Sequence, residues 1–143
     1  MLYKLTKEDA VAHFPHIWKS IADSIYCKPE DTYMQAQVKQ AIEELRLHVW
    51  IAIKQRKVIG IALTTLVYHA VEKDLTLLIY AIYVAEQDPS VLRDGYATLN
   101  NFAAELGCTT ISFFTNNPKI VKFAQHFNSH VEYHVVAPVI RST

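Results

Sequence analysis

The stretch Val49-Trp50-Ile51-Ala52, followed after a short gap by Val58-Ile59-Gly60-Ile61-Ala62, decides the fold of this chain. Residues 48–53 have the apolar, β-branched and aromatic composition of a strand, and residues 58–68 repeat it. The connection between them, Lys54-Gln55-Arg56-Lys57, is entirely polar. Two strand-like runs joined by a short polar turn predict a β-hairpin at the centre of the chain.

Further strands are predicted on both sides of this hairpin. Residues 75–84 are apolar or aromatic at almost every position, which is typical of a strand buried on both faces. Residues 1–6 and 109–115 are shorter strand candidates, and we expect residues 131–140 to supply the final β structure.

Helical signals separate these strands. Thr6 is an N-cap candidate with acidic residues behind it, and Pro15 suits a position near the start of a helix. The run Pro29-Glu30-Asp31-Thr32 marks the start of the next helix. Apolar residues at helical spacing predict a third helix that ends at Gly107, and a last helix begins near Pro118.

The expected order is therefore β, α, α, β, β, β, α, β, α, β. Hairpin-connected strands in the middle and alternating elements at the end predict an α/β (α+β) fold, with a mixed, mostly antiparallel sheet and helices on both faces. No linker, repeat or low-complexity segment interrupts the pattern, so we expect residues 1–143 to form a single domain.

Composition restricts the classes of function. Lys plus Arg and Asp plus Glu are equal at 14 each, so no basic surplus predicts a nucleic acid or a membrane surface as partner. The N-terminus lacks a signal-peptide pattern, and no apolar run reaches the roughly 18 residues of a membrane span. We therefore expect a soluble, cytoplasmic protein.

Metal and nucleophile patterns are weak. Cys27 and Cys108 form neither a CxxC pair nor a zinc spacing. His126, His130 and His134 recur every four residues, but the segment after Ser129 alternates like a strand, where residues four apart are separated by about 13 Å. We predict surface histidines and no metal site. No lipase-type serine motif, phosphate-binding loop or dinucleotide fingerprint occurs.

The element order resembles that of the GNAT acetyltransferase superfamily over nearly the whole chain. The hairpin of residues 49–62 is similar to the family's "x-W-hydrophobic-A, turn, V-hydrophobic-G" pattern, and residues 99–108 (LNNFAAELGC) look like its "L-x-x-F-A-x-x-x-G-C" helix end. The chain resembles in particular short GNAT-like proteins encoded on tailed-phage genomes. This resemblance implies an N-acetyltransferase with acetyl-CoA as co-substrate and a small amine or a protein amine as acceptor.

The resemblance also implies where acetyl-CoA binds. In the family the fourth strand, here residues 75–84, splays from the fifth and exposes its backbone to the pantetheine arm. The pyrophosphate lies at the start of the next helix, in a pattern Q/R-x-x-G-x-G/A that matches residues 92–97 (LRDGYA) with Leu92 at its first position. The implied cofactor contacts are Tyr83, Val84, Arg93, Gly95, Tyr96, Ala97 and Asn117. The other interpretation of Gly95 and Ala97 is that small residues allow close helix packing.

The catalytic residues are left unassigned. Where the family often has a tyrosine that protonates the CoA thiolate, this chain has Ala124. Residues 75–84 hold no carboxylate, so a water held by Tyr80, Tyr83 or His69 would have to act as base, unless these residues are simply core.

Two alternatives to an active enzyme are open. One is a non-catalytic protein of the same fold, either a phage virion or assembly component or an interaction module, with a possible homo-oligomer or virion proteins as partners. Such a protein would be found in the host cytoplasm or in the virion. The other is a protein that binds CoA or a related ligand without turnover.

Overall fold

Five strands form a single sheet in the computed structural model, which describes residues 1–22, 29–85, 89–115, 118–127, 129–132 and 135–140. They are β1 (Leu2–Lys4), β2 (His48–Lys54), β3 (Lys57–His69), β4 (Asp74–Val84) and β5 (Thr110–Phe113), and they lie in this order across the sheet. All neighbouring pairs are antiparallel except β4 and β5, which are parallel. The predicted mixed, mostly antiparallel sheet is confirmed.

The central hairpin is the one predicted from the sequence. Trp50 lies opposite Ala62 across β2 and β3, and the turn places Gln55 and Arg56 at φ of 51° and 63°. Positive φ at two adjacent turn residues gives the twist that tight hairpins require. The Trp50 indole Nε1 donates a hydrogen bond to Thr64 Oγ1 at 2.9 Å, and both residues are buried. This bond joins the two strands from within the core.

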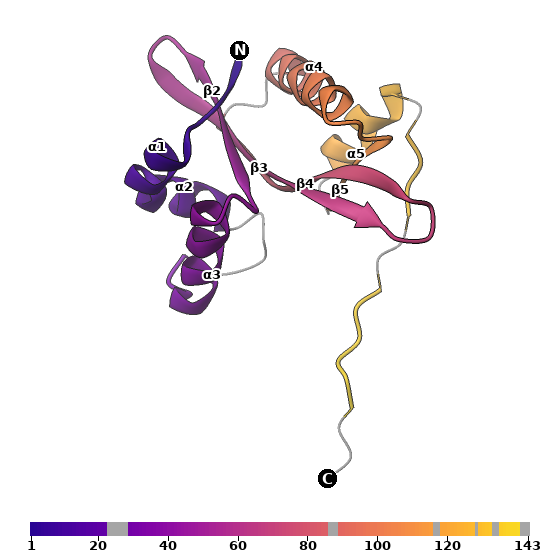
Figure 1. The fold of residues 1–143 in the computed structure, drawn as a ribbon. Helices are drawn as coiled ribbons and strands as arrows, with labels where there is room; N and C mark the ends of the chain where they lie inside the picture. Colours follow the sequence, from indigo (N-terminus) through magenta and orange to yellow (C-terminus); the bar gives the residue numbers. More distant parts are fainter. Residues whose placement is uncertain (23–28, 86–88, 116–117, 128, 133–134, 141–143) are drawn as a thin grey trace.

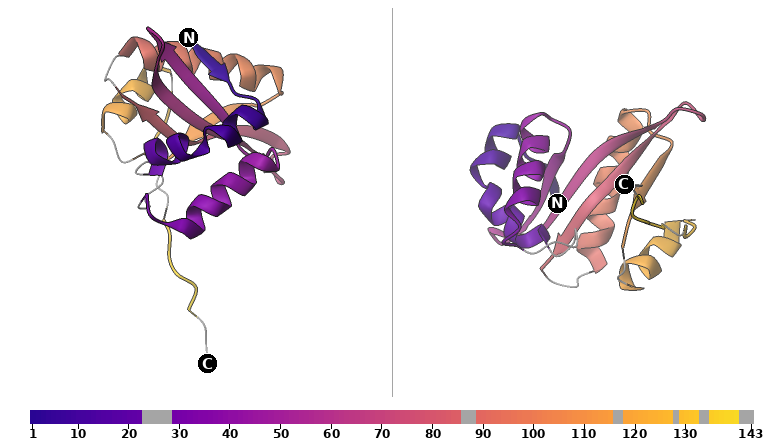
Figure 2. Two further views of the ribbon diagram at one scale, coloured as in Figure 1. Left: turned by 90° about the vertical axis from the view of Figure 1, so that its left-hand side faces the viewer. Right: turned by 90° about the horizontal axis from the view of Figure 1, so that it is seen from below.

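Three helices cover one face of the sheet, as Figures 1 and 2 show. They are α1 (Lys7–Ala12), α2 (Phe14–Ile21) and α3 (Thr32–Glu43). The Thr6 hydroxyl accepts a hydrogen bond from the Asp9 backbone N–H and so caps α1, as predicted. Pro15 lies in the first turn of α2, also as predicted. The core on this face is formed by Ala10, Phe14, Ile17, Trp18, Ile21, Ala22, Val38, Ala41, Ile42, Leu47, Val49, Ile61, Leu63 and Ala81.

The opposite face carries α4 (Pro89–Glu105) and α5 (Pro118–Ala124), followed by the short 3-10 helix η2 (Gln125–Phe127) (Figure 1). Gly107, at a φ of 80°, follows α4 as the sequence predicts, because a left-handed residue ends a helix at low cost when it lacks a Cβ. A second, smaller core lies on this face, formed by Trp50, Ala62, Leu77, Ile79, Leu99 and Ala103. Helices therefore cover both faces of the sheet.

A bulge interrupts β4. Leu63 of β3 lies opposite Ala81, but the next residue, Thr64, lies opposite Ile79, so Tyr80 is an extra residue on β4. The bulge reverses the alternation of β4: before it the odd-numbered Leu77 and Ile79 face α4, and after it Ile82 does.

The segment after η2 does not join the sheet. The strand predicted at residues 131–140 is wrong, because no strand occurs in the described residues 129–132 and 135–140. Figure 1 shows residues 135–140 extended and directed away from the body of the molecule. Its apolar composition favours β structure, but a strand needs a neighbour to pair with, and within its own chain this segment has none among the described residues.

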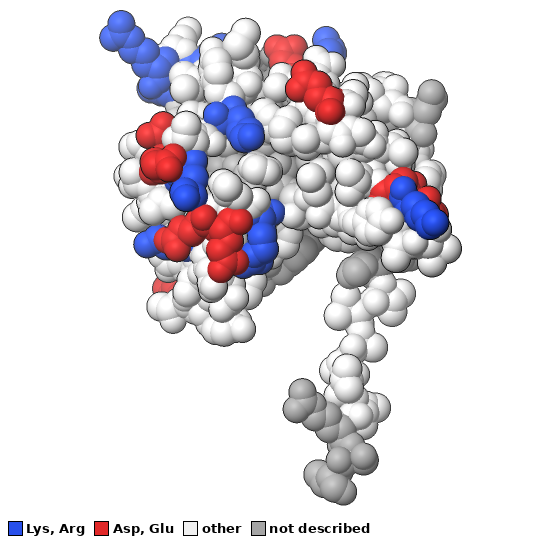
Figure 3. All heavy atoms as spheres, in the orientation of Figure 1, with Lys and Arg blue, Asp and Glu red and all other residues white. Residues whose placement is uncertain are grey.

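Charged side chains of both signs are mixed on the surface that Figure 3 shows. They gather over α1–α3 and near the β3–β4 turn, whereas the middle of this face is largely uncharged. None of the described helices is both long and apolar enough to cross a membrane.

Candidate cofactor site

The sheet opens between β4 and β5. Pairing of these strands begins at Thr76 with Thr110 and ends at Ile79 with Phe113, while β4 continues to Val84. The last part of β4 therefore lacks a strand neighbour on the β5 side among the described residues, as expected from the resemblance.

The hydrogen-bond pattern shows which backbone groups face this opening. The Ala85 amide donates to the Ile59 carbonyl at 2.8 Å, and Gly60 lies opposite Val84. Because antiparallel neighbours alternate between bonded and non-bonded pairs, the N–H and C=O of Val84 point away from β3. They are directed at the gap between β4 and β5.

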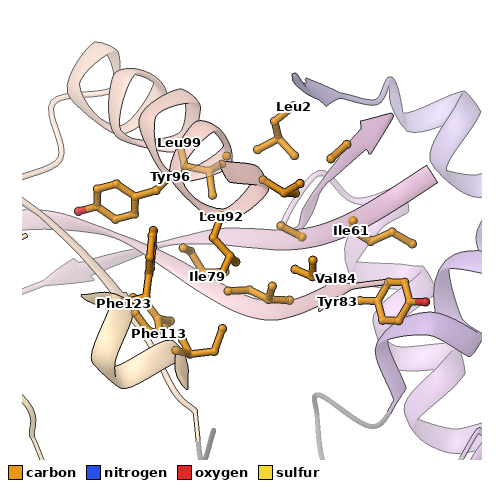
Figure 4. A pocket seen from close by; sticks show the side chains of 17 residues that line it. Leu2, Ile61, Ile79, Tyr83, Val84, Leu92, Tyr96, Leu99, Phe113 and Phe123 are labelled. Atoms are coloured by element: carbon orange, nitrogen blue, oxygen red, sulfur yellow. The ribbon is translucent and has the colours of Figure 1, made fainter. Parts of the chain in front are cut away.

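A pocket adjoins the gap, between the sheet and helices α4 and α5. Its empty space is about 610 Å³, part of which is open to solvent. Figure 4 shows the side chains around it. The lining is formed by Leu2, Ala52, Gly60, Ile61, Ala62, Ile79, Ile82, Tyr83, Val84, Val91, Leu92, Gly95, Tyr96, Leu99, Phe113, Ile120 and Phe123. Apart from two tyrosine hydroxyls, every side chain that the described part of the chain contributes to the lining is apolar, so the pocket suits an apolar or thin, amide-bearing ligand.

The tyrosines of β4 leave the gap open. Tyr80 and Tyr83 are partly buried against the core on the α1–α3 side of the sheet. Figure 4 shows the Tyr83 ring directed away from α4. The side chains that could have filled the opening therefore pack on the other face.

Helix α4 places the predicted cofactor residues on its first turns. Arg93 and Ala97 are exposed, and Gly95 is half-buried above β1. A Cβ at Gly95 would lie 3.9 Å from Leu2 Cδ2, which is an ordinary van der Waals contact. An alanine would fit there, so close packing does not explain this glycine.

Leu92 occupies the position where the family pattern has Arg or Gln. Its side chain lines the pocket and points from α4 toward the sheet (Figure 4). Arg93 is instead the exposed cation of this turn, with the exposed Asp94 beside it. Asn117, the remaining predicted contact, lies outside the described residues.

An aromatic cluster that sequence reasoning missed joins α4 to the C-terminal helices. Tyr96 stacks on Phe127 with ring centroids 4.2 Å apart, and it meets the edge of Phe123 at 6.5 Å. Burial raises the pKa of the Tyr96 hydroxyl, so it stays neutral at physiological pH. Its hydroxyl points out of the pocket in Figure 4. The four-residue spacing of Phe123 and Phe127 was the available signal, since such residues share a helix face.

His69 is far from the gap. It lies opposite Asp74 at the β3–β4 turn, and its Nε2 is 2.9 Å from Thr76 Oγ1. The open edge begins only after Ile79, about 15 Å further along the strand at the usual rise per residue. His69 is therefore not a candidate base at this site. Among the described residues, no group of His, Cys, Asp and Glu side chains is arranged to hold a metal ion.

Comparisons with known proteins agree with this geometry. A probable acetyltransferase of known structure is similar with a TM-score of 0.78 and 10% identity, over 99% of both chains. The aminoglycoside N-acetyltransferase AAC(6')-Iy in complex with CoA has a TM-score of 0.72 and 15% identity, over 99% of this chain and 95% of that one. A transcriptional regulator from Bacillus halodurans C-125 has a TM-score of 0.73 and 12% identity, over 98% and 99% of the two chains. No family model and no curated sequence matches the chain.

The chain thus has the fold of the GNAT acetyltransferases, as the sequence resemblance predicted. At identities of 10–15% these similarities show the fold alone.

Proposed function

We propose that this protein is an acyl-CoA-dependent N-acetyltransferase that binds acetyl-CoA in the gap between β4 and β5. The observation that carries the proposal is the open edge of β4 at Val84, beside an apolar pocket and the first turns of α4. A pantetheine arm is a thin chain with two amide groups, and it matches an apolar groove with backbone hydrogen-bonding groups on its wall.

The residues present fit this cofactor. Val84 offers its backbone N–H and C=O toward the gap, and Tyr83 lines the pocket beside it. Gly95, Tyr96 and Ala97 form the opposing surface on α4. Arg93 is exposed and would bind phosphate oxygens, assisted by the positive end of the helix dipole. Asn117 is proposed as a further contact, as the resemblance implies.

When bound, acetyl-CoA supplies an acetyl group activated as a thioester. In the transfer, the acceptor nitrogen forms a bond to the acetyl carbon, the carbon–sulfur bond breaks, and a proton leaves the nitrogen while the sulfur gains one. Among the described residues, the only polar side chains lining the pocket are Tyr83 and Tyr96, and the Tyr96 hydroxyl points outward. We therefore infer that the amine loses its proton to solvent, so the rate should rise with pH until the acceptor amine is neutral.

The test uses one backbone position. Val84→Pro removes the N–H that faces the gap and leaves the Ala85 bond to β3 in place, because proline lacks only its own donor. Val84→Ala is the matched control, since it trims the side chain but keeps the N–H. Calorimetry should detect acetyl-CoA binding to the natural chain and to Val84→Ala. The affinity of Val84→Pro for acetyl-CoA should be lower by about fivefold or more, which is the equivalent of one hydrogen bond. No heat and no thermal shift at millimolar acetyl-CoA would exclude the proposal.

One alternative rests on specific residues. Leu92 is packed into the pocket, and Ala124 has no proton to donate, so a GNAT-fold protein that binds CoA without turnover, or binds only a protein partner, is the second candidate. In that case it would serve as an interaction module or as a phage virion or assembly component, located in the host cytoplasm or in the virion. Thiol release from acetyl-CoA, measured with a panel of amines that includes aminoglycosides and a lysine peptide, separates the two. Binding without thiol release supports the alternative.

A further inference from the structure

The C-terminal part of the chain is poorly covered. From residue 104 onward none of the described residues is buried, although this part includes a strand and a helix of the fold. Phe114, directly after β5, is 58% exposed, and α5 buries none of its residues. A strand and a helix with this much exposed apolar surface indicate that another polypeptide segment packs on them.

Strand β5 is also the edge of the sheet. It pairs with β4 on one side, and no other described strand lies beyond it. The edge of a sheet presents backbone N–H and C=O groups that pair readily with an added strand. Such an edge next to exposed apolar side chains is an acceptor for one more strand.

The same chain carries a suitable donor, which we call the C-terminal tail (residues 129–132 and 135–140). Its start is held against α5, because the Ser129 hydroxyl donates to the Ala124 carbonyl at 2.6 Å. Beyond this point the tail leaves the body in Figures 1 and 2, and its residues 135–140 include no Lys, Arg, Asp or Glu. Val135 is 85% exposed and Ile140 is 93% exposed. The exposed apolar residues of the tail are Val131, Val135, Val136, Val139 and Ile140.

We propose that the C-terminal tail of one copy adds as a strand to the β5 edge of a second copy, and that the exchange is reciprocal. Each chain has one donor tail and one acceptor edge at β5, so a two-fold symmetric pair satisfies both. Backbone hydrogen bonds would supply affinity, and the valines of the tail would cover Phe114 and the open surface around β5.

A second copy fits better than the chain's own edge. The tail is directed away from the body, and an extended segment of its length reaches about 35 Å, much further than the span of β5. Its apolar residues near Ile140 would therefore lie beyond the edge of their own domain even if the tail folded back. The proposal does not depend on acetyl-CoA, because the outer edge of β5 is on the side away from the gap.

The test is the mass of the full chain in solution and its dependence on the tail. Sedimentation or light scattering at about 100 µM chain, far above the dissociation constant of a micromolar dimer, should give twice the chain mass of 16.4 kDa. The double variant Val135→Asp with Val136→Asp should give the single-chain mass, because two carboxylates cannot be buried against an apolar surface. Val71→Asp is the matched control, since Val71 is 89% exposed at the β3–β4 turn and should leave the dimer intact.

Hydrogen exchange then locates the contact. The amides of β5 that face away from β4 should be protected in the natural chain and should exchange at least tenfold faster in the double variant, while those of the β2–β3 hairpin stay unchanged. A natural chain that is monomeric at this concentration overturns the proposal, and so does a dimer that survives the double substitution. Protection of these outward-facing β5 amides in a monomer also overturns it, because the tail would then pair with its own sheet.

Discussion

The hydrogen bond between Trp50 and Thr64 should carry a measurable part of the stability of the sheet. Thr64 is fully buried and Trp50 is 4% exposed. The substitution Thr64→Val therefore removes the acceptor that the described residues give the indole N–H, at 2.9 Å, and water cannot replace it. Valine has nearly the shape of threonine, so packing changes little. Leaving a buried donor unsatisfied costs about 1–3 kcal/mol, and we expect a loss of this size in the free energy of unfolding.

Urea denaturation followed by circular dichroism measures this loss from the shift in midpoint at constant slope. Thr65→Val is the control on the next residue, because the Thr65 hydroxyl donates to the Arg46 carbonyl at 2.7 Å at an exposed site where water can replace it. A double-mutant cycle that combines Thr64→Val with Trp50→Phe isolates this hydrogen bond, and the expected coupling free energy is about 1 kcal/mol. Equal losses for the two threonines, or zero coupling in the cycle, would refute the assignment of this bond to the core.

Three further substitutions test single features of the fold. Gly95→Ala should raise the free energy of unfolding by about 0.5–1 kcal/mol, because the new Cβ has room inside a helix, whereas Gly107→Ala should lower it by about 1–2 kcal/mol, because its φ is 80°. Thermal melts should therefore shift in opposite directions for the two. Burial, and secondarily the charge of Lys4, lower the pKa of His48 in the folded state. The unfolded state therefore protonates this imidazole more readily, and the free energy of unfolding falls as the pH drops below about 6.5. In His48→Asn the urea midpoint should fall less between about pH 7.5 and pH 5 than in the natural chain, and an equal fall would show that His48 is not responsible.

Local patterns predicted most elements of the fold. The hairpin at residues 48–68, the cap at Thr6 and the helix stop at Gly107 all depend on the chemistry of a few adjacent residues, and the structure confirms them. The tail was predicted wrongly for a physical reason. Its valines have strand propensity, but pairing depends on a neighbour that the sequence does not reveal.

The site was harder to predict than the fold. The bulge at Tyr80 leaves no signature in a run that is apolar throughout, yet it determines which face of the sheet each later side chain of β4 occupies. Position 92 corresponds to an Arg or Gln in the family pattern, and the structure adds that the leucine found here is directed into the pocket. Side-chain direction depends on where the helix begins, and a spacing pattern fixes this only within a residue or two.

The energetics of the open edge favour one kind of ligand over others. The Val84 N–H and C=O face the gap. Removing a peptide group from water without a new hydrogen-bond partner costs about 1–3 kcal/mol of free energy. A purely apolar ligand that filled the pocket would cover these groups and incur that cost. A ligand with amide groups spaced along a thin apolar chain would replace the water bonds and also bury its methylenes against the pocket wall. Acyl-pantetheine has this composition, which is why we rank CoA thioesters above simple hydrophobic ligands for this site.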